Sequence, residues 1–236
     1  MSMLSMYKGE SPLGTEIRRV VSRLKVWQVE QNCKTVMVTS SALGEGKSTF
    51  ASSLAIGCSE FRGTKTVIVD FDLRRPTIHQ LFGLRRSRGV AEILSGTQSL
   101  RACLKQTPYE ELRVLTCGRN SQVNVSSLLN SGRIENLFSE LKFYFDVVIV
   151  DAPPVIPVSD PLMLGSEIDG ALFVVKAGKT QKPVVRRAVQ VLQDAGITTL
   201  GVIINNVEHV LPYYYDYNFY GYQYYAEKPN IDRQSP

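Results

Sequence analysis

The segment from Thr35 to Thr49 constrains the fold of this chain more than any other. Thr35-Val-Met-Val-Thr39 is an apolar, β-branched run, and a loop of small residues leads from it into Gly44-Glu-Gly-Lys-Ser-Thr49. A helical pattern of apolar residues begins at Phe50. A strand, a glycine loop and a helix in this order are the context of a phosphate-binding P-loop, because loop N–H groups and the helix N-terminus attract an anion. The expected nucleotide-binding residues are Gly44, Glu45, Gly46, Lys47, Ser48 and Thr49.

Two of these residues have expected roles in a nucleoside triphosphate site. Lys47 is expected to bind the β- and γ-phosphates, and the Ser48 hydroxyl is expected to bind Mg²⁺. One position departs from the pattern, because Ser41 stands where the first glycine of G-x-x-x-x-G-K-[ST] belongs. The competing interpretation is a glycine that caps a helix in an ordinary α/β protein.

Length and composition indicate one sizeable domain. The chain has 236 residues, 44% hydrophobic and 21% charged, with a net charge of +5. The mild charge gives no reason to expect a nucleic-acid partner, and the short basic groups are typical of solvated helix faces. Four cysteines lie far apart among only two histidines, so a zinc site is not expected. The sequence has no signal-peptide pattern and no apolar run long enough to span a bilayer, which predicts a soluble, cytoplasmic protein.

Carboxylates follow two further apolar runs. Asp70 and Asp72 follow Thr66-Val-Ile-Val, and Asp151 ends Val147-Val-Ile-Val. In an extended chain Asp70 and Asp72 point the same way, toward the edge of a parallel sheet where ligands bind. An apolar run that ends in aspartate downstream of a P-loop is the Walker B pattern, so Asp151 is expected near Mg²⁺.

The remaining patterns alternate between helix and strand. They predict an α/β fold: a doubly wound, mostly parallel sheet flanked by helices. The expected elements are an amphipathic helix at 13–28, a P-loop helix capped by Gly63, short helices and loops over 77–111, a strand at 112–116, a long amphipathic pattern from 124 or 125 to 143, a strand at 171–175, a helix at 181–195 and a strand at 199–204.

The end of the chain differs from the rest. It holds eight of the eleven tyrosines in thirteen residues, without a periodicity that would bury them on one face. An aromatic patch packed on the domain and a sticky partner-binding segment are both open interpretations. A third is a set of phosphoryl acceptors, since each residue offers a phenolic hydroxyl. These candidate acceptors are Tyr213, Tyr214, Tyr215, Tyr217, Tyr220, Tyr222, Tyr224 and Tyr225.

Together these features resemble the bacterial tyrosine kinases. Gly44–Thr49, Val67–Pro76 and Val147–Pro154 are similar to the Walker A, Walker A′ and Walker B motifs of that family, and the tyrosine-rich end is similar to its autophosphorylated cluster. The resemblance extends from about residue 11 to 225. It implies a P-loop kinase domain over 13–210 between an N-terminal extension, 1–12, and a tyrosine-rich tail, 211–236.

The resemblance also implies activity and partners. It implies an autokinase that uses ATP and Mg²⁺, releases ADP, and phosphorylates the tyrosine tail of a neighbouring subunit in a ring. Phosphorylation of the tails, reversed by a tyrosine phosphatase, dissociates the ring. Members of the family regulate the synthesis and export of capsular or extracellular polysaccharide. They work with a membrane activator of the chain-length-determinant type, which recruits the kinase to the inner face of the cell membrane.

Carried over to this sequence, the resemblance assigns the catalytic groups. Lys47 binds phosphate, and Ser48, Asp72 and Asp151 bind Mg²⁺. Asp70 is the preferred acceptor of the tyrosine proton, although Asp70 and Asp72 could exchange roles. Asn205, after the last strand, matches the position that contacts adenine in related P-loop proteins.

The expected subunit interface departs from the family pattern. The family's interface helix often has Glu-x-x-Arg-x-x-Arg; Glu16 and Arg19 fit, but Ser22 stands at the third position and Arg23 comes one residue late. One residue on a helix is a rotation of about 100°. Ring assembly is therefore less firmly indicated than catalysis.

Two alternatives stay open. The first is a partition or division-site ATPase of the same P-loop branch, a switch that dimerises on ATP. Such proteins have an additional lysine at the position of Ala42 and no clustered tyrosines, and both differences count against this reading. The second is a non-catalytic scaffold with a vestigial P-loop, against which the intact Lys47, Ser48 and three aspartates argue.

Overall fold

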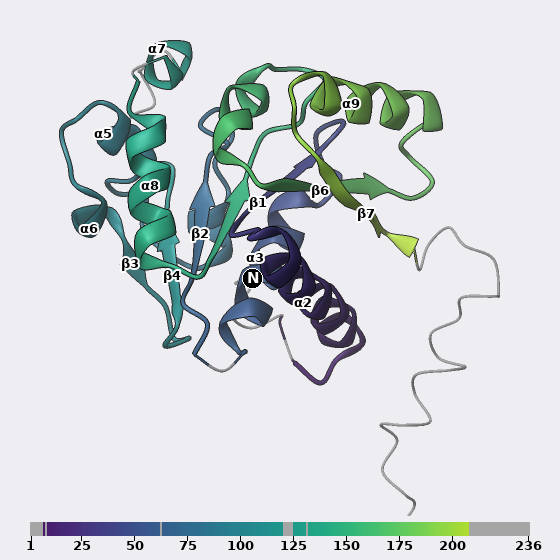
Figure 1. The fold of residues 1–236 in the computed structure, drawn as a ribbon, viewed down its shortest axis with the longest axis horizontal. Helices are drawn as coiled ribbons and strands as arrows, with labels where there is room; N and C mark the ends of the chain where they lie inside the picture. Colours follow the sequence, from purple (N-terminus) through teal and green to yellow (C-terminus); the bar gives the residue numbers. More distant parts are fainter. Residues whose placement is uncertain (1–6, 8, 62, 120–124, 131, 208–236) are drawn as a thin grey trace, which may run out of the picture.

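The β-branched runs of the chain form the strands of a central sheet. The computed structural model describes residues 7, 9–61, 63–119, 125–130 and 132–207 (Figure 1). Within this part of the chain the sheet has seven strands in the order β3-β4-β2-β5-β1-β6-β7. The strands are β1 (Thr35–Ser40), β2 (Thr66–Asp70), β3 (Lys105–Gln106), β4 (Leu112–Leu115), β5 (Val147–Asp151), β6 (Gly170–Lys176) and β7 (Thr199–Asn205).

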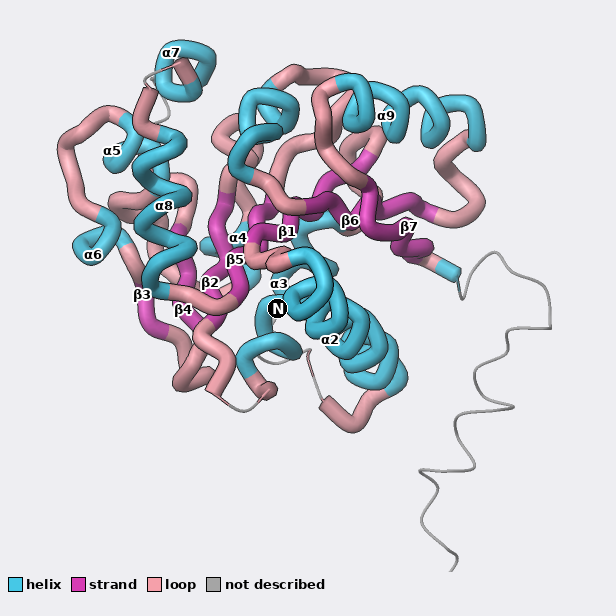
Figure 2. The backbone as a smooth tube through the Cα atoms, in the orientation of Figure 1, coloured by secondary structure: helices cyan, strands magenta, loops and turns pink. Residues whose placement is uncertain are grey.

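Helices cover both faces of this sheet (Figure 2). The helices are α2 (Pro12–Gln31), α3 (Lys47–Ser59), α4 (Ile78–Leu81), α5 (Val90–Leu94), α6 (Leu100–Cys103), α7 (Val125–Leu129), α8 (Ile134–Tyr144), the 3-10 helix η1 (Asp160–Glu167) and α9 (Lys182–Asp194). One core joins the sheet to α2, α3 and α4, and a second core joins it to α5–α9 and η1. The α/β fold with a mostly parallel, helix-flanked sheet is thus as predicted.

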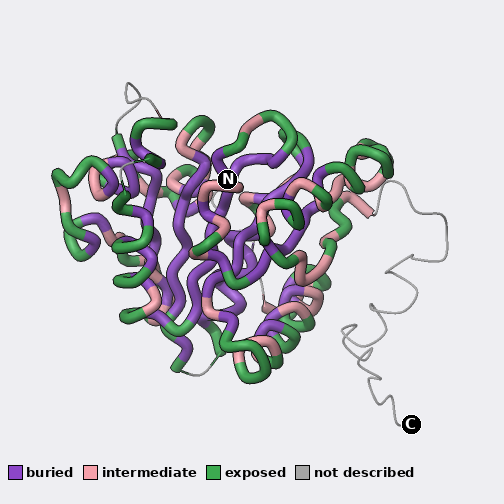
Figure 3. Tube along the Cα trace, turned by 45° about the horizontal axis from the view of Figure 1, so that its top comes forward, coloured by how far each residue is buried: buried purple, intermediate pink, exposed green. Residues whose placement is uncertain are grey.

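The middle strands are buried on both faces, which explains their continuous apolar runs. Every residue of β1, β2 and β5 is buried, and buried residues are concentrated in the sheet in Figure 3. Alternate side chains enter opposite cores: Val148 and Val150 pack on the α8 side, whereas Val147 and Ile149 pack on the α3 side. Parallel pairing places Asp70 opposite Asp151 at the carboxyl ends of β2 and β5.

Several predicted boundaries were wrong. The P-loop helix ends at Ser59 with Glu60 as its C-cap, and Gly63, the predicted cap, lies in the next turn with a φ of 67°. The pattern from 124 or 125 to 143 is divided into α7 and α8, because the chain turns at Gly132 with a φ of 69°. The short strand β3, antiparallel to β4, was not predicted.

The N-terminal helix is longer at both ends than the predicted span 13–28. Ser11 caps it by accepting a hydrogen bond from the Gly14 N–H at 3.1 Å, and Pro12 stands in its first turn, where a missing N–H is harmless. Asn32 ends the helix in the left-handed conformation, with a φ of 52°. Among the described residues, no helix is both long and apolar enough to cross a membrane.

Candidate active site

The P-loop connects β1 to α3 through a backbone shape that requires glycine. Gly44 and Gly46 have φ angles of 78° and 92°, in the left-handed region. A Cβ on Gly46 would lie 2.1 Å from the side-chain nitrogen of Asn205. Helix α3 then begins at Lys47, so the N–H groups of its first turn have no intrahelical partner and face an incoming anion. Thr49 lies exposed in this first turn.

Lys47 lies between two of the predicted carboxylates. Its Nζ is 2.9 Å from Asp72 Oδ2 and 3.3 Å from Asp151 Oδ1, and all three side chains are at most 10% exposed. Burial lowers the pKa of the Lys47 ammonium, but attraction to Asp151 and Asp72 outweighs burial and holds the pKa above its usual value. The site therefore keeps a charged lysine where phosphate oxygens would bind.

Asp70 and Asp72 have different hydrogen-bond partners at this edge of the sheet. Strand β2 ends at Asp70, so Asp72 lies in the following loop, where its other oxygen accepts the Arg75 N–H at 2.9 Å. Asp70 Oδ2 accepts the Ile78 N–H at 3.1 Å. Its Oδ1 is buried without a hydrogen-bond partner. Burial and the neighbouring charge of Asp151 raise the pKa of Asp70 well above its usual value.

One of the predicted metal ligands, Asp151, has a carboxylate oxygen without a hydrogen-bond partner. This oxygen, Oδ2, is buried, and burial raises the pKa of this carboxyl to about 6. The Ser48 hydroxyl lies 3.1 Å from Lys47 Nζ. Among the described residues no three His, Cys, Asp or Glu side chains form a metal-binding cluster. Mg²⁺ commonly takes one or two carboxylates together with substrate phosphates, so the donor set fits a magnesium–nucleotide complex better than an all-protein metal site.

The Glu45 side chain connects the P-loop to the end of β6 and to the loop after it. The P-loop motif alone does not indicate this role. One carboxylate oxygen accepts hydrogen bonds from the Ser41 hydroxyl at 2.8 Å and the Ala42 N–H at 2.6 Å. The other accepts from the Lys176 N–H, at the end of β6, and from the Thr180 hydroxyl, in the loop between β6 and α9. Burial raises the pKa of Glu45, but these hydrogen bonds outweigh it and the net pKa is lowered.

Asn205 contacts the P-loop itself. Its side-chain nitrogen donates to the Glu45 carbonyl oxygen at 2.9 Å, and its Oδ1 accepts the Asn206 N–H. Asn205 therefore lies against the P-loop and supports the loop conformation. Contact with adenine stays a prediction.

A further ion pair lies beside the site and was not predicted. The Arg74 guanidinium donates two hydrogen bonds to Asp160, at 2.7 and 2.9 Å. This pair joins the loop after β2 to η1. It fixes the backbone near Asp72, and no local sequence pattern connects residues 86 positions apart.

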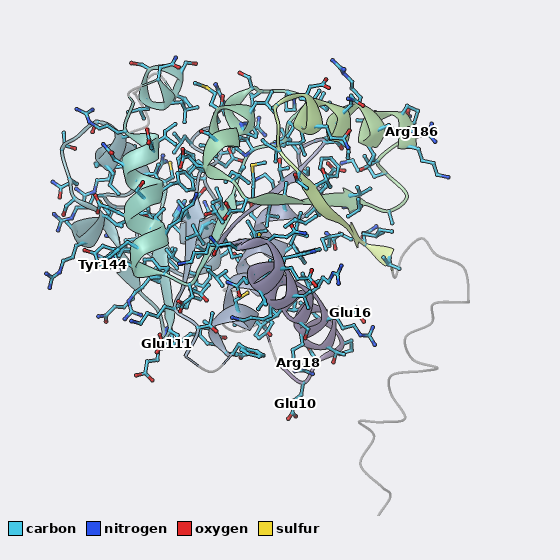
Figure 4. All side chains as sticks on the ribbon, viewed as in Figure 1. Glu10, Glu16, Arg18, Glu111, Tyr144 and Arg186 are labelled. Carbon is cyan, nitrogen blue, oxygen red and sulfur yellow. The ribbon has the colours of Figure 1, made fainter. Side chains whose placement is uncertain are left out.

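The predicted interface residues lie on the exposed face of α2. Arg19 forms an ion pair with Glu16 at 2.6 Å, and the Arg23 guanidinium lies 5.3 Å from the centre of the Trp27 ring. Figure 4 shows Glu16 and Arg18 at the outer end of the helix. An intersubunit role for these residues stays a prediction. The eight candidate acceptor tyrosines lie outside the described residues.

Sequence comparisons relate the chain to a P-loop NTPase family and to a tyrosine kinase. Residues 31–223 match the family model described as ParA, NUBPL iron-transfer P-loop NTPase. The chain is 32% identical over 220 residues to tyrosine-protein kinase YwqD of Bacillus subtilis (strain 168), covering 93% of this chain and 91% of YwqD.

Solved structures similar to this chain include the kinase domain of a tyrosine kinase. The chimerical protein CapA2B2 has a TM-score of 0.79 and 30% identity, over 86% of this chain and 88% of the chimera. The kinase domain of the Escherichia coli tyrosine kinase ETK has a TM-score of 0.75 and 29% identity, over 80% of this chain and 73% of that one.

Proposed function

The chain belongs to the bacterial tyrosine kinase family, and from this premise we propose that it is an ATP-dependent protein-tyrosine autokinase. The observation that carries the proposal is the position of Lys47. It lies under the P-loop between Asp72 and Asp151, at the sheet edge where nucleotides bind in this fold. The cluster has the acidic and cationic groups that phosphoryl transfer needs.

The reaction transfers the γ-phosphoryl group of ATP to a tyrosine. The phenolic oxygen forms a bond to the γ-phosphorus, the bond from that phosphorus to the β–γ bridging oxygen breaks, and ADP leaves. Lys47 and the N–H groups of the P-loop bind the phosphate oxygens and stabilise the charge that moves onto them. Ser48, Asp72 and Asp151 would hold Mg²⁺, which supplies further neutralisation of phosphate charge when bound.

Asp70 is our proposed acceptor of the phenolic proton. Its pKa is raised by burial and by Asp151, and a raised pKa makes a carboxylate a better base. Its Oδ1 has no hydrogen-bond partner. Asp72 is less suited to this role because its two oxygens bind Lys47 and the Arg75 N–H. Replacing Asp70 with Asn should lower the rate of phosphorylation more than it weakens ATP binding, which a comparison of kcat and the ATP dissociation constant would measure.

The proposed acceptors are the eight tyrosines between 213 and 225, presented by one subunit of a ring-like homo-oligomer to the site of the next. The family resemblance supports this assignment, together with the density of phenolic hydroxyls in that segment. Glu16, Arg19 and Arg23 are the proposed interface residues on α2. Size measurement before and after phosphorylation tests the oligomer: a chain that stays monomeric in both states would refute it.

We further propose that the kinase regulates exopolysaccharide or capsule synthesis at the inner face of the membrane. The resemblance supports a membrane activator of the chain-length-determinant type and a tyrosine phosphatase as partners. The likeness to a solved structure described as the chimerical protein CapA2B2 is consistent with this proposal. Co-purification of the kinase with such an activator from membranes, lost on deletion of the activator, would test recruitment.

Mass spectrometry after incubation with Mg-ATP is the central experiment. The expected result is phosphotyrosine within 213–225, absent from a Lys47→Met variant. ATP hydrolysis with unmodified tyrosines would instead favour the partition-type ATPase switch. If basal activity is low, the cytoplasmic segment of a membrane activator is added as a control.

A further inference from the structure

A basic cavity lies apart from the nucleotide site. Its volume is about 560 Å³, within the range of small-ligand sites. The residues that line it come from the loop before α5, α5 itself, the loop after it, β3 and the segment after β4. They are Ser87, Arg88, Glu92, Thr97, Gln98, Lys105 and Arg119.

The carboxylate in this cavity forms no ion pair with the cations beside it, within the part of the chain that the structure describes. Glu92 uses its two oxygens to accept the Gly89 N–H at 2.7 Å and the Arg119 N–H at 3.0 Å, both from the backbone. Arg88 donates to the neutral side chain of Gln98 at 3.2 Å. Among the described residues no ion pair involves Arg88, Lys105 or Arg119. Three cations with one occupied carboxylate favour an anionic ligand.

Helix α5, which contributes Glu92 to the cavity, begins at the same edge of the sheet as the active site. The N–H groups of Val90 and Ala91 bond to the carbonyls of Thr116 and Cys117, just beyond the carboxyl end of β4. Figure 1 shows α5, α6 and β3 together at the end of the sheet opposite β7. From β5, which ends in Asp151, the order runs through β2 and β4 to β3. Lys105, the cavity residue on β3, is therefore three strand spacings from β5, about 14 Å across the sheet at about 4.8 Å per spacing.

We propose that this cavity binds a phosphotyrosine of the 213–225 segment from another copy of this chain, and thereby positions a second tyrosine of the same segment at the active site. The inference rests on the proposed kinase function. Asp216 is the sole acidic residue in that segment, so the unmodified segment has little charge for the cavity. Each phosphate adds a charge of about −1.5 to −2 and acceptors for arginine.

The spacing of the tyrosines matches the distance. Four extended residues span about 13 Å, close to the distance from Lys105 to β5 across the sheet. Tyr213 and Tyr217 are four residues apart, and so are Tyr220 and Tyr224. One phosphorylation therefore assists the next, so that multiply phosphorylated chains accumulate early.

Peptide binding tests the cavity without requiring any kinase activity. The probe is a synthetic peptide of residues 213–225 with phosphate on Tyr220, bound to the full-length Lys47→Met chain and followed by fluorescence anisotropy. We expect it to bind at least about tenfold more tightly than the unphosphorylated peptide, as charge-assisted hydrogen bonds to arginine should provide. An Arg88→Gln/Arg119→Gln variant should lose this preference, and Arg101→Gln, an exposed arginine of α6 outside the cavity lining, should keep it.

Three results would overturn the inference. They are equal binding of the two peptides, a preference that survives in the Arg88→Gln/Arg119→Gln variant, and inorganic phosphate competing as well as the phosphopeptide at equal concentration. Thermal melting checks that the double variant is folded. If it is not, Lys105→Gln replaces it in the same comparison, with the same outcomes.

Intact-mass spectrometry in a time course tests the consequence for the kinase. In the wild-type chain the second phosphate should be added faster than the first. The ratio of second to first rates should fall about tenfold in Arg88→Gln/Arg119→Gln and stay unchanged in Arg101→Gln. An unchanged ratio in the double variant would refute positioning by the cavity. A wild-type chain that gains no phosphate at all would refute the kinase function instead.

Discussion

The hydrogen bonds of Glu45 predict a measurable coupling between the P-loop and the loop that follows β6. Glu45 is 2% exposed and accepts from Ser41 and Ala42 on one side and from Lys176 and Thr180 on the other. Glu45→Gln preserves shape but replaces one acceptor oxygen with an amide that donates. Thr180→Val preserves shape and removes the hydroxyl. The two changes therefore test the same contact from its two ends.

The expected loss in the free energy of unfolding follows from the hydrogen-bond donors that lose an acceptor in each variant. A hydrogen bond to a charged group contributes about 1.5–3 kcal/mol. In Glu45→Gln the remaining oxygen can still face Ala42 and Ser41, while the Thr180 hydroxyl can turn to accept. The Lys176 N–H is left without an acceptor, so the loss in the free energy of unfolding should be about 2–4 kcal/mol. Thr180→Val should cost about 1–2 kcal/mol, because Glu45 keeps its other three donors.

Urea unfolding of the two single variants and the double variant measures the coupling. We expect an interaction energy of about 1–2 kcal/mol, within the range for residues in one hydrogen-bond network. The dissociation constant for ATP should rise about tenfold in Glu45→Gln, since a loosened loop no longer presents its N–H groups together. Strictly additive effects on stability, with ATP affinity unchanged, would refute the role assigned to Glu45.

The same contact predicts a pH dependence with a definite sign. The folded-state pKa of Glu45 is lowered, so the carboxylate stabilises the fold at pH values above its unfolded pKa of about 4.3. That contribution is lost as the pH falls through the folded-state value. The stability difference between wild type and Glu45→Gln should therefore be full near neutrality and shrink in acid, and a difference that grew in acid would contradict the assignment.

Substitutions at Lys47, Gly46 and Asp160 test neighbouring contacts. Lys47→Met should abolish phosphorylation, and Lys47→Arg, which keeps the charge but not the point-like ammonium, should restore ATP binding in part, as measured by labelling and calorimetry. Gly46→Ala should destabilise the chain by about 2 kcal/mol or more, because its Cβ collides with Asn205 and its φ is positive; adding Asn205→Ala should recover part of the loss in urea unfolding, and no recovery would exclude the collision. Asp160→Asn should cost about 1–2 kcal/mol, at the lower end because the Arg74 side chain is 43% exposed, and Arg74→Gln in that background should add little.

The buried strands and the P-loop helix depend on residues close together in the sequence, so their positions could be predicted from the sequence. Continuous β-branched runs identify buried parallel strands, and the predicted apolar run 66–69 lies within the observed strand β2, Thr66–Asp70. The sequence predicted a helix after the glycine loop, with a helical pattern from Phe50; the observed helix begins three residues earlier, at Lys47, and its predicted end was also wrong. The helix ends with Glu60 as its C-cap, in the ordinary right-handed conformation. The prediction that Gly63 caps the helix was therefore wrong.

Contacts between distant segments could not be predicted in the same way. The Glu45 carboxylate meets Thr180 only because β1 and β6 are neighbours in the sheet. Likewise, Arg74 meets Asp160 because η1 returns beside the loop after β2. The two-residue strand β3 contains only Lys105 and Gln106, which show no strand periodicity, and tertiary pairing with β4 decides its conformation.

The charges at the carboxyl edge of the sheet explain why these aspartates serve ligand binding better than stability. Asp70, Asp72 and Asp151 are all at most 2% exposed, and Lys47 is the cation within ion-pair distance of two of them. Three ionised carboxylates beside one ammonium would leave a net charge of −2 in a buried site. Protonation relieves part of that cost, which accounts for the raised pKa values of Asp70 and Asp151. A divalent cation would relieve it completely, and phosphate oxygens would then compete for Lys47. Binding of the metal and binding of the nucleotide should therefore favour each other at this edge, because the positive charge of the cation and the negative charge of the phosphates offset each other.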